Sequence, residues 1–517
     1  MYKKAIYLFL VLALLLAACA PKATPTAAPE PTQPAAEEEK PEPTKAPELE
    51  PVTITWYLAG SVPVDLKEVN EYLSNLPQLK AINTKVELIF FDWGEYDQKM
   101  QLMFAGGEEC DLVFTASWMN NYTNNAINGN LIPLDDLLPK VTPKLWEAIP
   151  ENAWTMSKVR GKIYGIPNQQ IWYEAWGIIL DKEIADKYSI DLAKINTFED
   201  LNPYLAKVYE GEPQLKKKII GELNGTHVHP LTWNYEQVTL PGVIKLGDTT
   251  RKIVNWYETP EFRKAIELSY QWHEAGYSPD EPLDGAEMNK GRMIGEYPFK
   301  FHVAKPGVDS EEKAMTGREQ VAKSLQPPVL SYVTPTMTGI CTTSKNPERA
   351  LMVFELSFLD EVVYNTIAKG IEGKHWVWVD KEKKVIGYPE GITAENTTWL
   401  GNSRDWMFGN QFIAYYVDAN QVGAWEETER INNEASLPMD GPFVFDPSPV
   451  QAEVAAVDAV VQQFTPPLYW GLVSPDDPEK GIDAFNKALK DAGVEKILAE
   501  MQKQLDAFIA ENPDIYK

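Results

Sequence analysis

The first part of the folded body shows two hydrophobic periods in turn. Residues 52–58 (VTITWYL) alternate apolar and polar positions often enough to predict a strand, and Leu66, Val69 and Leu73 follow at helical spacing. Residues 86–91 predict a second strand. The chain therefore opens with a strand, a helix and another strand.

A second helix and a third strand follow directly. We expect Asp92 to cap this helix, Gly106 and Gly107 to end it, and the apolar run 112–114 to form the next strand. The apolar face of the helix is predicted to carry Tyr96, Met100 and Phe104. Strands that alternate with helices indicate an α/β fold with a parallel sheet, and such sheets bind ligands at the carboxyl ends of their strands. Those ends fall near residues 59–61, 92–93 and 115–118.

The rest of the chain predicts a second folded half. Residues 162–167 and 175–180 are typical of two further strands, with the crossing between halves expected between them and a helix opening at Asp181. Residues 350–359 are strongly helical. Two helical stripes near the C-terminus consist of Val450, Val454, Val457, Val461 and Phe464, and of Ile497, Met501, Leu505 and Phe508. A chain of 517 residues is too long for a single hydrophobic core, so we expect two lobes.

The N-terminus has the pattern of an export signal. Lys3 and Lys4 precede the apolar run 5–18, which is too short to span a bilayer comfortably. The tetrad Leu16-Ala17-Ala18-Cys19 resembles the lipobox of bacterial lipoproteins, in which the cysteine is lipidated and becomes the new N-terminus. We therefore expect residues 1–18 to be a signal peptide and Cys19 to carry a lipid. Residues 19–50 are then a Pro-, Ala- and Glu-rich linker.

Composition narrows the choice of partners. The formal net charge of -27 repels phosphate backbones, so we expect no nucleic-acid partner and favour an extracellular protein that is a monomer. Cys110 and Cys341 are the two other cysteines; they could form a disulfide in an oxidising compartment, although buried free thiols are equally compatible with the sequence.

Several motifs taken together resemble a known family. Trp93, Tyr96 and Lys99 lead into residues 104–108 (FAGGE) and 110–112 (CDL). Two further stretches are 126–138 (AINGNLIPLDDLL) and 164–167 (YGIP). In order and spacing they are similar to the extracellular solute-binding proteins of ABC importers, in the branch associated with carbohydrates. The resemblance begins at the lipobox and runs through nearly all of the mature body.

The C-terminal part resembles an uncharacterised domain found on lipoproteins of this group. The matching stretches are residues 370–375 (GIEGKH), 408–412 (FGNQF), 445–449 (FDPSP) and 502–505 (QKQL). The resemblance implies a two-lobed periplasmic-binding-protein-like fold of type II, with two mixed sheets flanked by helices and a hinge between the lobes. It also implies a membrane-anchored receptor that closes on a solute and delivers it to an ABC permease.

Domain boundaries follow from the pattern and the resemblance together. We expect one lobe to comprise residues 51–168 plus about 337–395. The other lobe is expected to comprise about 169–336 plus about 396–517, including the C-terminal domain.

A sugar site needs flat aromatic rings for stacking and amides or charged groups for hydrogen bonds. Trp93 and Trp118 follow predicted strand ends, where this architecture places ligands. The remaining candidates lie beside Trp118, at the expected crossing, or in loops of the second lobe: Asn120, Asn121, Gln169, Gln170, Trp172, Tyr173, Trp233, Tyr235, Trp399 and Asn402. For Trp406 and Phe408, packing in the core of the C-terminal domain is the preferred interpretation.

Signals for catalysis or metal binding are weak. His227 and His229 would share one face of a strand, but no further histidine or cysteine ligand is near in sequence. Adjacent acids such as Asp135 and Asp136 are usually solvated caps, and the sequence contains no nucleophile elbow, phosphate loop, dinucleotide fingerprint or zincin helix. We therefore expect no catalytic residue, no metal and no cofactor.

The sequence favours a receptor for an extracellular carbohydrate, most plausibly an oligosaccharide. One alternative is a surface glycan-degrading enzyme, which would bring two carboxylates face to face in the cleft. Another is a lipoprotein that binds peptides or a sensor partner, in a groove with few stacking aromatics.

Overall fold

A computed structural model of the chain describes residues 49–221, 229–283, 285–331, 333–393, 396–399 and 404–516. The expected signal peptide, Cys19, nearly all of the linker, His227 and Asn402 lie outside these residues. Within the described body two large hydrophobic cores are present, one built around Trp56 and Phe114 and the other around Trp256 and Phe301. We call the parts packed on these cores the N-lobe and the C-lobe.

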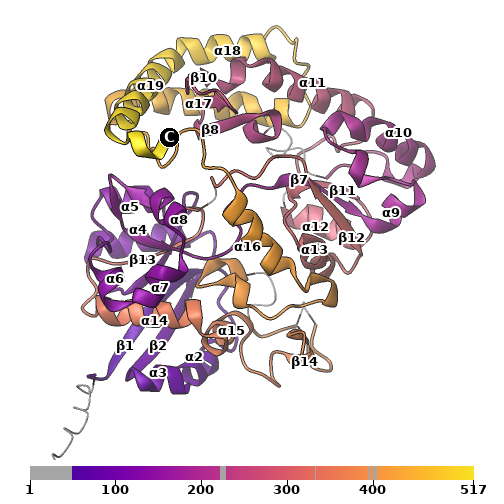
Figure 1. The fold of residues 1–517 in the computed structure, drawn as a ribbon. Coiled ribbons are helices and arrows are strands. Elements are labelled where there is room, and N and C mark those ends of the chain that lie inside the picture. The colour runs from indigo at the N-terminus through magenta and orange to yellow at the C-terminus, as the bar shows by residue number, and fades with distance from the viewer. Residues whose placement is uncertain are drawn as a thin grey trace, which may run out of the picture. The chain divides into compact units, whose positions relative to one another are not determined.

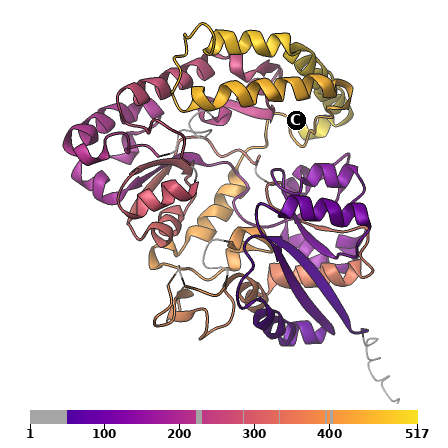
Figure 2. The same cartoon turned by 180° about the vertical axis from the view of Figure 1, so that it is seen from behind.

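The N-lobe is built on a five-stranded mixed sheet in the order β2-β1-β3-β13-β6 (Figure 1). Its strands are β1 (Val52–Ala59), β2 (Thr84–Phe91), β3 (Leu112–Thr115), β6 (Gly165–Pro167) and β13 (Met337–Ile340). The first three run parallel, as the strand and helix alternation predicts, and Figure 2 shows β1 and β2 in indigo, side by side. β13 pairs antiparallel with both β3 and β6, so a strand from far along the chain completes the sheet.

Short helices cover this sheet. They are α2 (Leu66–Ser74), α3 (Pro77–Ala81), α4 (Tyr96–Gly106), α5 (Tyr122–Ile127), α6 (Leu137–Val141), α7 (Pro143–Ala148), α8 (Glu151–Met156), α14 (Pro347–Leu359) and α15 (Glu361–Lys369). A two-residue hairpin of β4 (Lys158–Val159) and β5 (Lys162–Ile163) precedes β6. Gly107 ends α4 in a left-handed conformation, as predicted. The prediction that Asp92 caps α4 is wrong: its carbonyl closes a turn onto Glu95 and Tyr96, and the helix begins at Tyr96.

The C-lobe contains two three-stranded antiparallel sheets. One consists of β7 (Trp176–Asp181), β11 (Phe299–Val303) and β12 (Gln320–Ser324), and the other of β8 (Tyr235–Thr239), β9 (Gly242–Lys245) and β10 (Ile253–Asn255). Helices surround them: α9 (Lys182–Lys187), α10 (Asn202–Gly211), α11 (Pro260–Glu274), α12 (Gly285–Met293), α13 (Val308–Thr316), α17 (Gln451–Tyr469), α18 (Ile482–Asp491) and α19 (Val494–Glu511). Residue Asp181 caps α9 with its side chain, as predicted.

Residues 396–399 and 404–425 do not belong to the lobe in which the sequence analysis placed them. Trp399, Phe408 and Trp425 belong to the N-lobe core, because this segment lies against α14 and α15. The segment leads into α16 (Ala424–Glu434). The hairpin of β14 (Val377–Asp380) and β15 (Val385–Gly387) packs against the segment through Tyr415. The chain packs against the C-lobe core again from Met439, and Phe445 is the next buried residue of that core.

Among the described residues, three crossings therefore connect the lobes: residues 168–175, residues 325–331 with 333–336, and residues 435–444. Backbone bonds tie them together, since Glu174 donates to the carbonyl of Val329 and Leu330 donates to that of Ser436. Cys110 and Cys341 form a disulfide within the N-lobe, with 5.7 Å between their Cα atoms, which settles the choice that the sequence left open.

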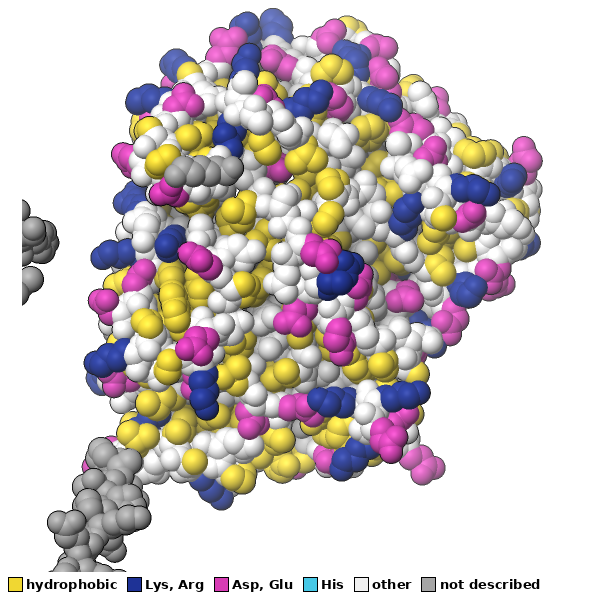
Figure 3. All heavy atoms as spheres, viewed as in Figure 1, with side chains coloured by type: hydrophobic (Ala, Val, Ile, Leu, Met, Phe, Trp, Pro, Cys, Tyr) yellow, Lys and Arg dark blue, Asp and Glu magenta, His cyan; other side chains and the backbone are white. Residues whose placement is uncertain are grey.

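The surface mixes both signs of charge. Figure 3 shows acidic and basic side chains interspersed over one face, with apolar side chains between them. Within the described residues, no helix combines the length and the apolarity that a membrane crossing requires.

Candidate ligand-binding site

A cavity of about 1400 Å³ is lined by residues of both lobes. Aromatic residues line it from the N-lobe side, and charged and polar residues line it from the C-lobe side. Its principal lining residues are Ser61, Trp93, Trp118, Gln170, Lys300, His302, Lys305, Glu311, Glu312, Thr316, Tyr388, Trp399, Asp405, Trp406 and Gln411. This volume exceeds the roughly 300–1000 Å³ of ordinary small-molecule pockets.

Three tryptophans form an aromatic platform in this cavity, and we refer to Trp93, Trp118 and Trp406 by that name. The ring centroids of Trp93 and Trp406 lie 6.2 Å apart and their planes are nearly parallel. Trp118 lies 6.3 Å from Trp93 and 6.1 Å from Trp406. Trp118 is 48% exposed although its indole nitrogen donates to the carbonyl of Pro335, so the ring is held in place while one side stays open.

The sheet explains where two of these rings lie. β1, β2 and β3 run parallel, so their carboxyl ends meet at one edge, and Ser61, Trp93 and Trp118 follow those ends by a few residues. The ends of these strands, where the sequence analysis expects a ligand to bind, therefore face this cavity.

Trp406 comes from a distant part of the chain, and the sequence interpretation as core alone is incomplete. It packs edge-on against Phe114 at 6.1 Å and also lines the cavity. A short 3-10 helix, Asp405–Met407, positions it. That helix is fixed by a buried ion pair of Asp405 with Lys369, whose shorter N–O distance is 2.6 Å, and by the hydroxyl of Tyr364, which donates to the carbonyl of Asp405.

Two more predicted residues line the cavity. Gln170 donates from its amide to the hydroxyl of Thr336 at 3.3 Å. Trp399 is 5% exposed and donates to the carbonyl of Ile367. Thr398, which precedes Trp399, donates a hydrogen bond to the carboxylate of Asp65. This bond, together with Lys374 and His375, lowers the pKa of Asp65 to about 2.

The remaining described candidates have structural roles and do not line the cavity. Trp172 is buried in the N-lobe core, and Tyr173 is buried in a small cluster with Ile171. Gln169 pairs through its backbone with residues 409 and 411. Asn120 is buried and donates to the carbonyl of Phe114, and Asn121 caps α5.

The two candidates of the C-lobe behave in the same way. Trp233 packs on Phe198, and the hydroxyl of Tyr235 donates to Glu261. Proximity to polar residues in sequence did not distinguish these buried aromatics from aromatics that face a cavity.

The charged lining residues are ion-paired. Glu312 accepts from Lys300 at 3.0 Å, and Glu311 pairs with Lys305 at 2.9 Å. Burial, assisted by the positive charge of Lys300, lowers the pKa of His302 to about 3, so its imidazole is neutral and offers one donor and one acceptor. Sequence reasoning missed all of these residues, which lie within residues 300–312, because no local pattern shows that β11, α13 and the loop between them face the cavity.

A second cavity, of about 180 Å³, lies where the three crossings meet. Three acids line it: Glu174, Glu236 and Asp440. Burial raises the pKa of Glu236 to about 7 and that of Asp440 well above its ordinary range. A neighbouring carboxyl adds to each rise: Glu174 acts on Glu236, and Glu236 acts on Asp440. The backbone N–H of Leu231 donates to Nδ1 of His229, so the neutral imidazole carries its proton on Nε2. Nε2 lies 3.2 Å from a carboxylate oxygen of Glu174.

Burial lowers the pKa of His229, which keeps this imidazole neutral. Among the described residues no cluster of three or more histidine, cysteine or acidic side chains has an arrangement suited to a metal ion.

Comparison with known families identifies the class of protein. Residues 71–348, more than half of the chain, match the bacterial extracellular solute-binding protein family, and the chain belongs to this family. Residues 439–510 match a domain of unknown function, DUF3502. Membership of this family implies a solute-binding protein that faces the outside of the cell, and two lobes with a cavity between them fit that class.

Individual relatives are similar over nearly the whole chain. A carbohydrate ABC transporter substrate-binding protein of Streptococcus pneumoniae serotype 4 is 26% identical over 467 residues, which cover 88% of this chain and 91% of the relative. The crystal structure of the N-glycan transport solute binding protein of Streptococcus pneumoniae has a TM-score of 0.76 at 24% identity, covering 90% of this chain and all of that one. Its complex with Man1GlcNAc has a TM-score of 0.71 at 25% identity, covering 89% and 100%. The fold is that of the type II periplasmic binding proteins, as the sequence resemblance implied.

Proposed function

We propose that this protein captures an extracellular oligosaccharide and delivers it unchanged to the permease of an ABC importer. The observation that carries the proposal is the aromatic platform of Trp93, Trp118 and Trp406, open to a cavity large enough for several sugar units. Sugars present apolar C–H faces that stack on such rings, and their hydroxyls bind the amides and charged groups of the opposite wall. The complexes of its relative with Man1GlcNAc and Man5GlcNAc support a glycan ligand.

Binding is proposed to close the lobes about the three crossings. Because platform residues lie in the N-lobe and Lys300, His302 and Glu312 lie in the C-lobe, a ligand that contacts both walls favours the arrangement that brings them together. The two-lobed division with a hinge is the mechanical basis of this proposal.

A glycan-degrading enzyme is less well supported by the same cavity. Each carboxylate that lines it among the described residues is in an ion pair: Glu311 with Lys305, Glu312 with Lys300, and Asp405 with Lys369. A glycosidase needs one carboxylic acid that holds a proton at the scissile bond, and an ion-paired carboxylate is poorly suited to that. We therefore propose a receptor that acts without catalysis.

Export and anchoring belong to the same proposal. The lipobox at Cys19 is proposed to hold a monomeric receptor at the outer face of the membrane on a linker that ends near residue 50. The Cys110–Cys341 disulfide supports an oxidising compartment. Replacing Cys19 by Ala should release the protein into the medium and abolish incorporation of labelled fatty acid; retention of the label would contradict the anchor.

Isothermal titration against mannose-containing and other neutral oligosaccharides tests the ligand class. The wild type should bind saturably, and Trp118→Ala should weaken binding about tenfold to a hundredfold, because the open ring supplies stacking area. Trp146→Phe is the matched control, since Trp146 stacks on Trp154 within the N-lobe and does not line the cavity.

Chromatography of the recovered ligand separates the alternatives. Unchanged ligand is expected, whereas shorter sugars would establish an enzyme. Binding of peptides in preference to glycans would refute the carbohydrate proposal.

A further inference from the structure

A buried ionic cluster stands behind the C-lobe wall of the large cavity. Glu312 of α13 accepts from Lys300 of β11 at 3.0 Å and from the guanidinium of Arg292 of α12. The side chains of the three residues are only 5%, 6% and 3% exposed. Although burial alone would raise it, the pKa of Glu312 lies below its ordinary value because Lys300 and Arg292 are close, so the group is a carboxylate.

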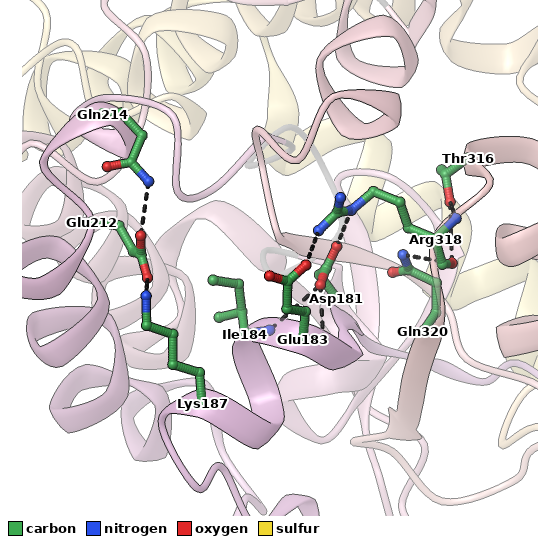
Figure 4. A network of polar contacts seen from close by, with 9 residues as sticks. All are labelled: Asp181, Glu183, Ile184, Lys187, Glu212, Gln214, Thr316, Arg318 and Gln320. Carbon is green, nitrogen blue, oxygen red and sulfur yellow. Dashed lines mark hydrogen bonds and ion pairs between the residues drawn. The ribbon is translucent and has the colours of Figure 1, made fainter.

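This cluster is continuous with a second network in the same lobe. Arg292 also donates to Gln320 of β12 at 3.1 Å, and Gln320 donates to the carbonyl of Arg318 at 3.2 Å. Figure 4 shows Arg318 extending from there towards the carboxylates of Asp181 and Glu183. Glu312 and Lys300 are thus fixed by partners from several elements before any ligand arrives, which lowers the ordering cost of binding.

Lys300 and Glu312 line the cavity, whereas Arg292 and Gln320 lie behind them. The ammonium of Lys300 has three donors and gives one to Glu312, while the carboxylate of Glu312 has about four acceptor positions and receives two hydrogen bonds. A donor and an acceptor with spare capacity therefore stand side by side at the cavity wall. Stability alone is a weak reason for such a buried pair, because apolar residues of similar volume usually stabilise a fold as well.

We propose that Lys300 and Glu312 determine ligand specificity by reading two neighbouring hydroxyls of one sugar residue. One hydroxyl oxygen accepts from the Lys300 ammonium, and the adjacent hydroxyl donates to the Glu312 carboxylate. This inference rests on the proposed carbohydrate function and assigns the hydroxyl-recognising half of the site to the C-lobe, facing the aromatic platform of the N-lobe. Lys305 and Glu311 form a similar pair but are more exposed, at 10% and 29%, so water competes with them and they discriminate less.

The test is a titration series with Man1GlcNAc and Man5GlcNAc, or the tightest ligand of the glycan panel, and with analogues of each that lack one hydroxyl. In the wild type, removing a recognised hydroxyl should weaken binding about tenfold to a hundredfold, because a charged partner is left unsatisfied in a buried wall. Glu312→Gln should weaken binding of the parent sugar to a similar extent and lose the distinction between parent and deoxy analogue. Glu319→Gln is the matched control, because it also replaces a carboxylate paired with a lysine but lies outside the cavity lining, and it should keep both the affinity and that distinction.

Urea denaturation shows whether Glu312→Gln folds, and Lys300→Arg is the second test if it does not. Lys300→Arg keeps the positive charge but places its hydrogen-bond donors differently, so a different deoxy analogue should be discriminated against. If Glu312→Gln or Lys300→Arg binds the parent sugar as tightly as the wild type does and discriminates against the same deoxy analogues, the inference is overturned. The proposed receptor function would still stand. Absence of any glycan binding by the wild type overturns both.

Discussion

The acids where the crossings meet make a sharp prediction about pH. Glu236 lies in β8, its carboxylate accepts from the backbone of Met439 in the third crossing, and its other oxygen has no hydrogen-bond partner. Burial raises its pKa from 4.5 to about 7. In the unfolded chain this carboxyl ionises near 4.5, so between these two values the unfolded state releases a proton that the folded state keeps.

The sign and size of the effect follow from that difference. Stability is fully present below the unfolded pKa and falls as the pH rises towards the folded pKa. At about 1.36 kcal/mol per pKa unit, the rise of the Glu236 pKa from 4.5 to about 7 corresponds to about 3 kcal/mol of stability lost between mildly acidic and mildly alkaline solution. Glu236→Gln resembles the protonated form and keeps an oxygen for Met439 N–H. The variant should therefore match the wild type near pH 4.5 and exceed it by about 3 kcal/mol near pH 8.

Urea denaturation followed by tryptophan fluorescence at the two pH values measures this directly. Glu258→Gln, at an exposed position of the same lobe, serves as the control and should leave the free energy of unfolding unchanged at both pH values. If Glu236→Gln and the wild type lose the same stability between the two pH values, the buried-carboxyl reasoning is refuted.

Two further predictions concern the N-lobe. Cys110→Ser with Cys341→Ser should lower the free energy of unfolding by about 2–5 kcal/mol, because the bond joins residues 231 apart; reductant should bring the wild type to the same melting temperature and leave the double variant unchanged. Lys369→Met should destabilise the lobe by about 3–5 kcal/mol in urea, since it leaves Asp405 buried without its cation, and Lys369→Met with Asp405→Leu should recover most of the loss; no recovery would argue against the ion pair as the cause.

The sequence predicted the N-lobe better than the site. β1, β2 and β3 were recognisable because their periodicity is local, and Trp93 and Trp118 could be placed because the ends of parallel strands meet at one edge. Trp406 could not be placed, since its position depends on the buried ion pair that its neighbour Asp405 forms with Lys369 of α15. Trp172 and Trp233 were chosen for their polar neighbours, yet burial is decided by packing partners that a local window does not contain.

The charged half of the cavity illustrates the same limit. Arg292, Lys300 and Glu312 carry no spacing that separates them from ordinary surface residues, and they meet only because α12, β11 and α13 pack together. Likewise, the assignment of residues 396–399 and 404–425 to the C-lobe was wrong, because the helices that they pack on, α14 and α15, precede them in sequence and belong to the N-lobe.

The position of β13 in the N-lobe sheet determines when during synthesis this sheet can be completed. Met337–Ile340 lies between β3 and β6, so the sheet stays incomplete, with an open edge at β3, until the ribosome has synthesised the chain as far as residue 340. Such long-range pairing is slow to form, since a large loop must close first. The nascent chain therefore cannot complete its N-lobe sheet early in synthesis.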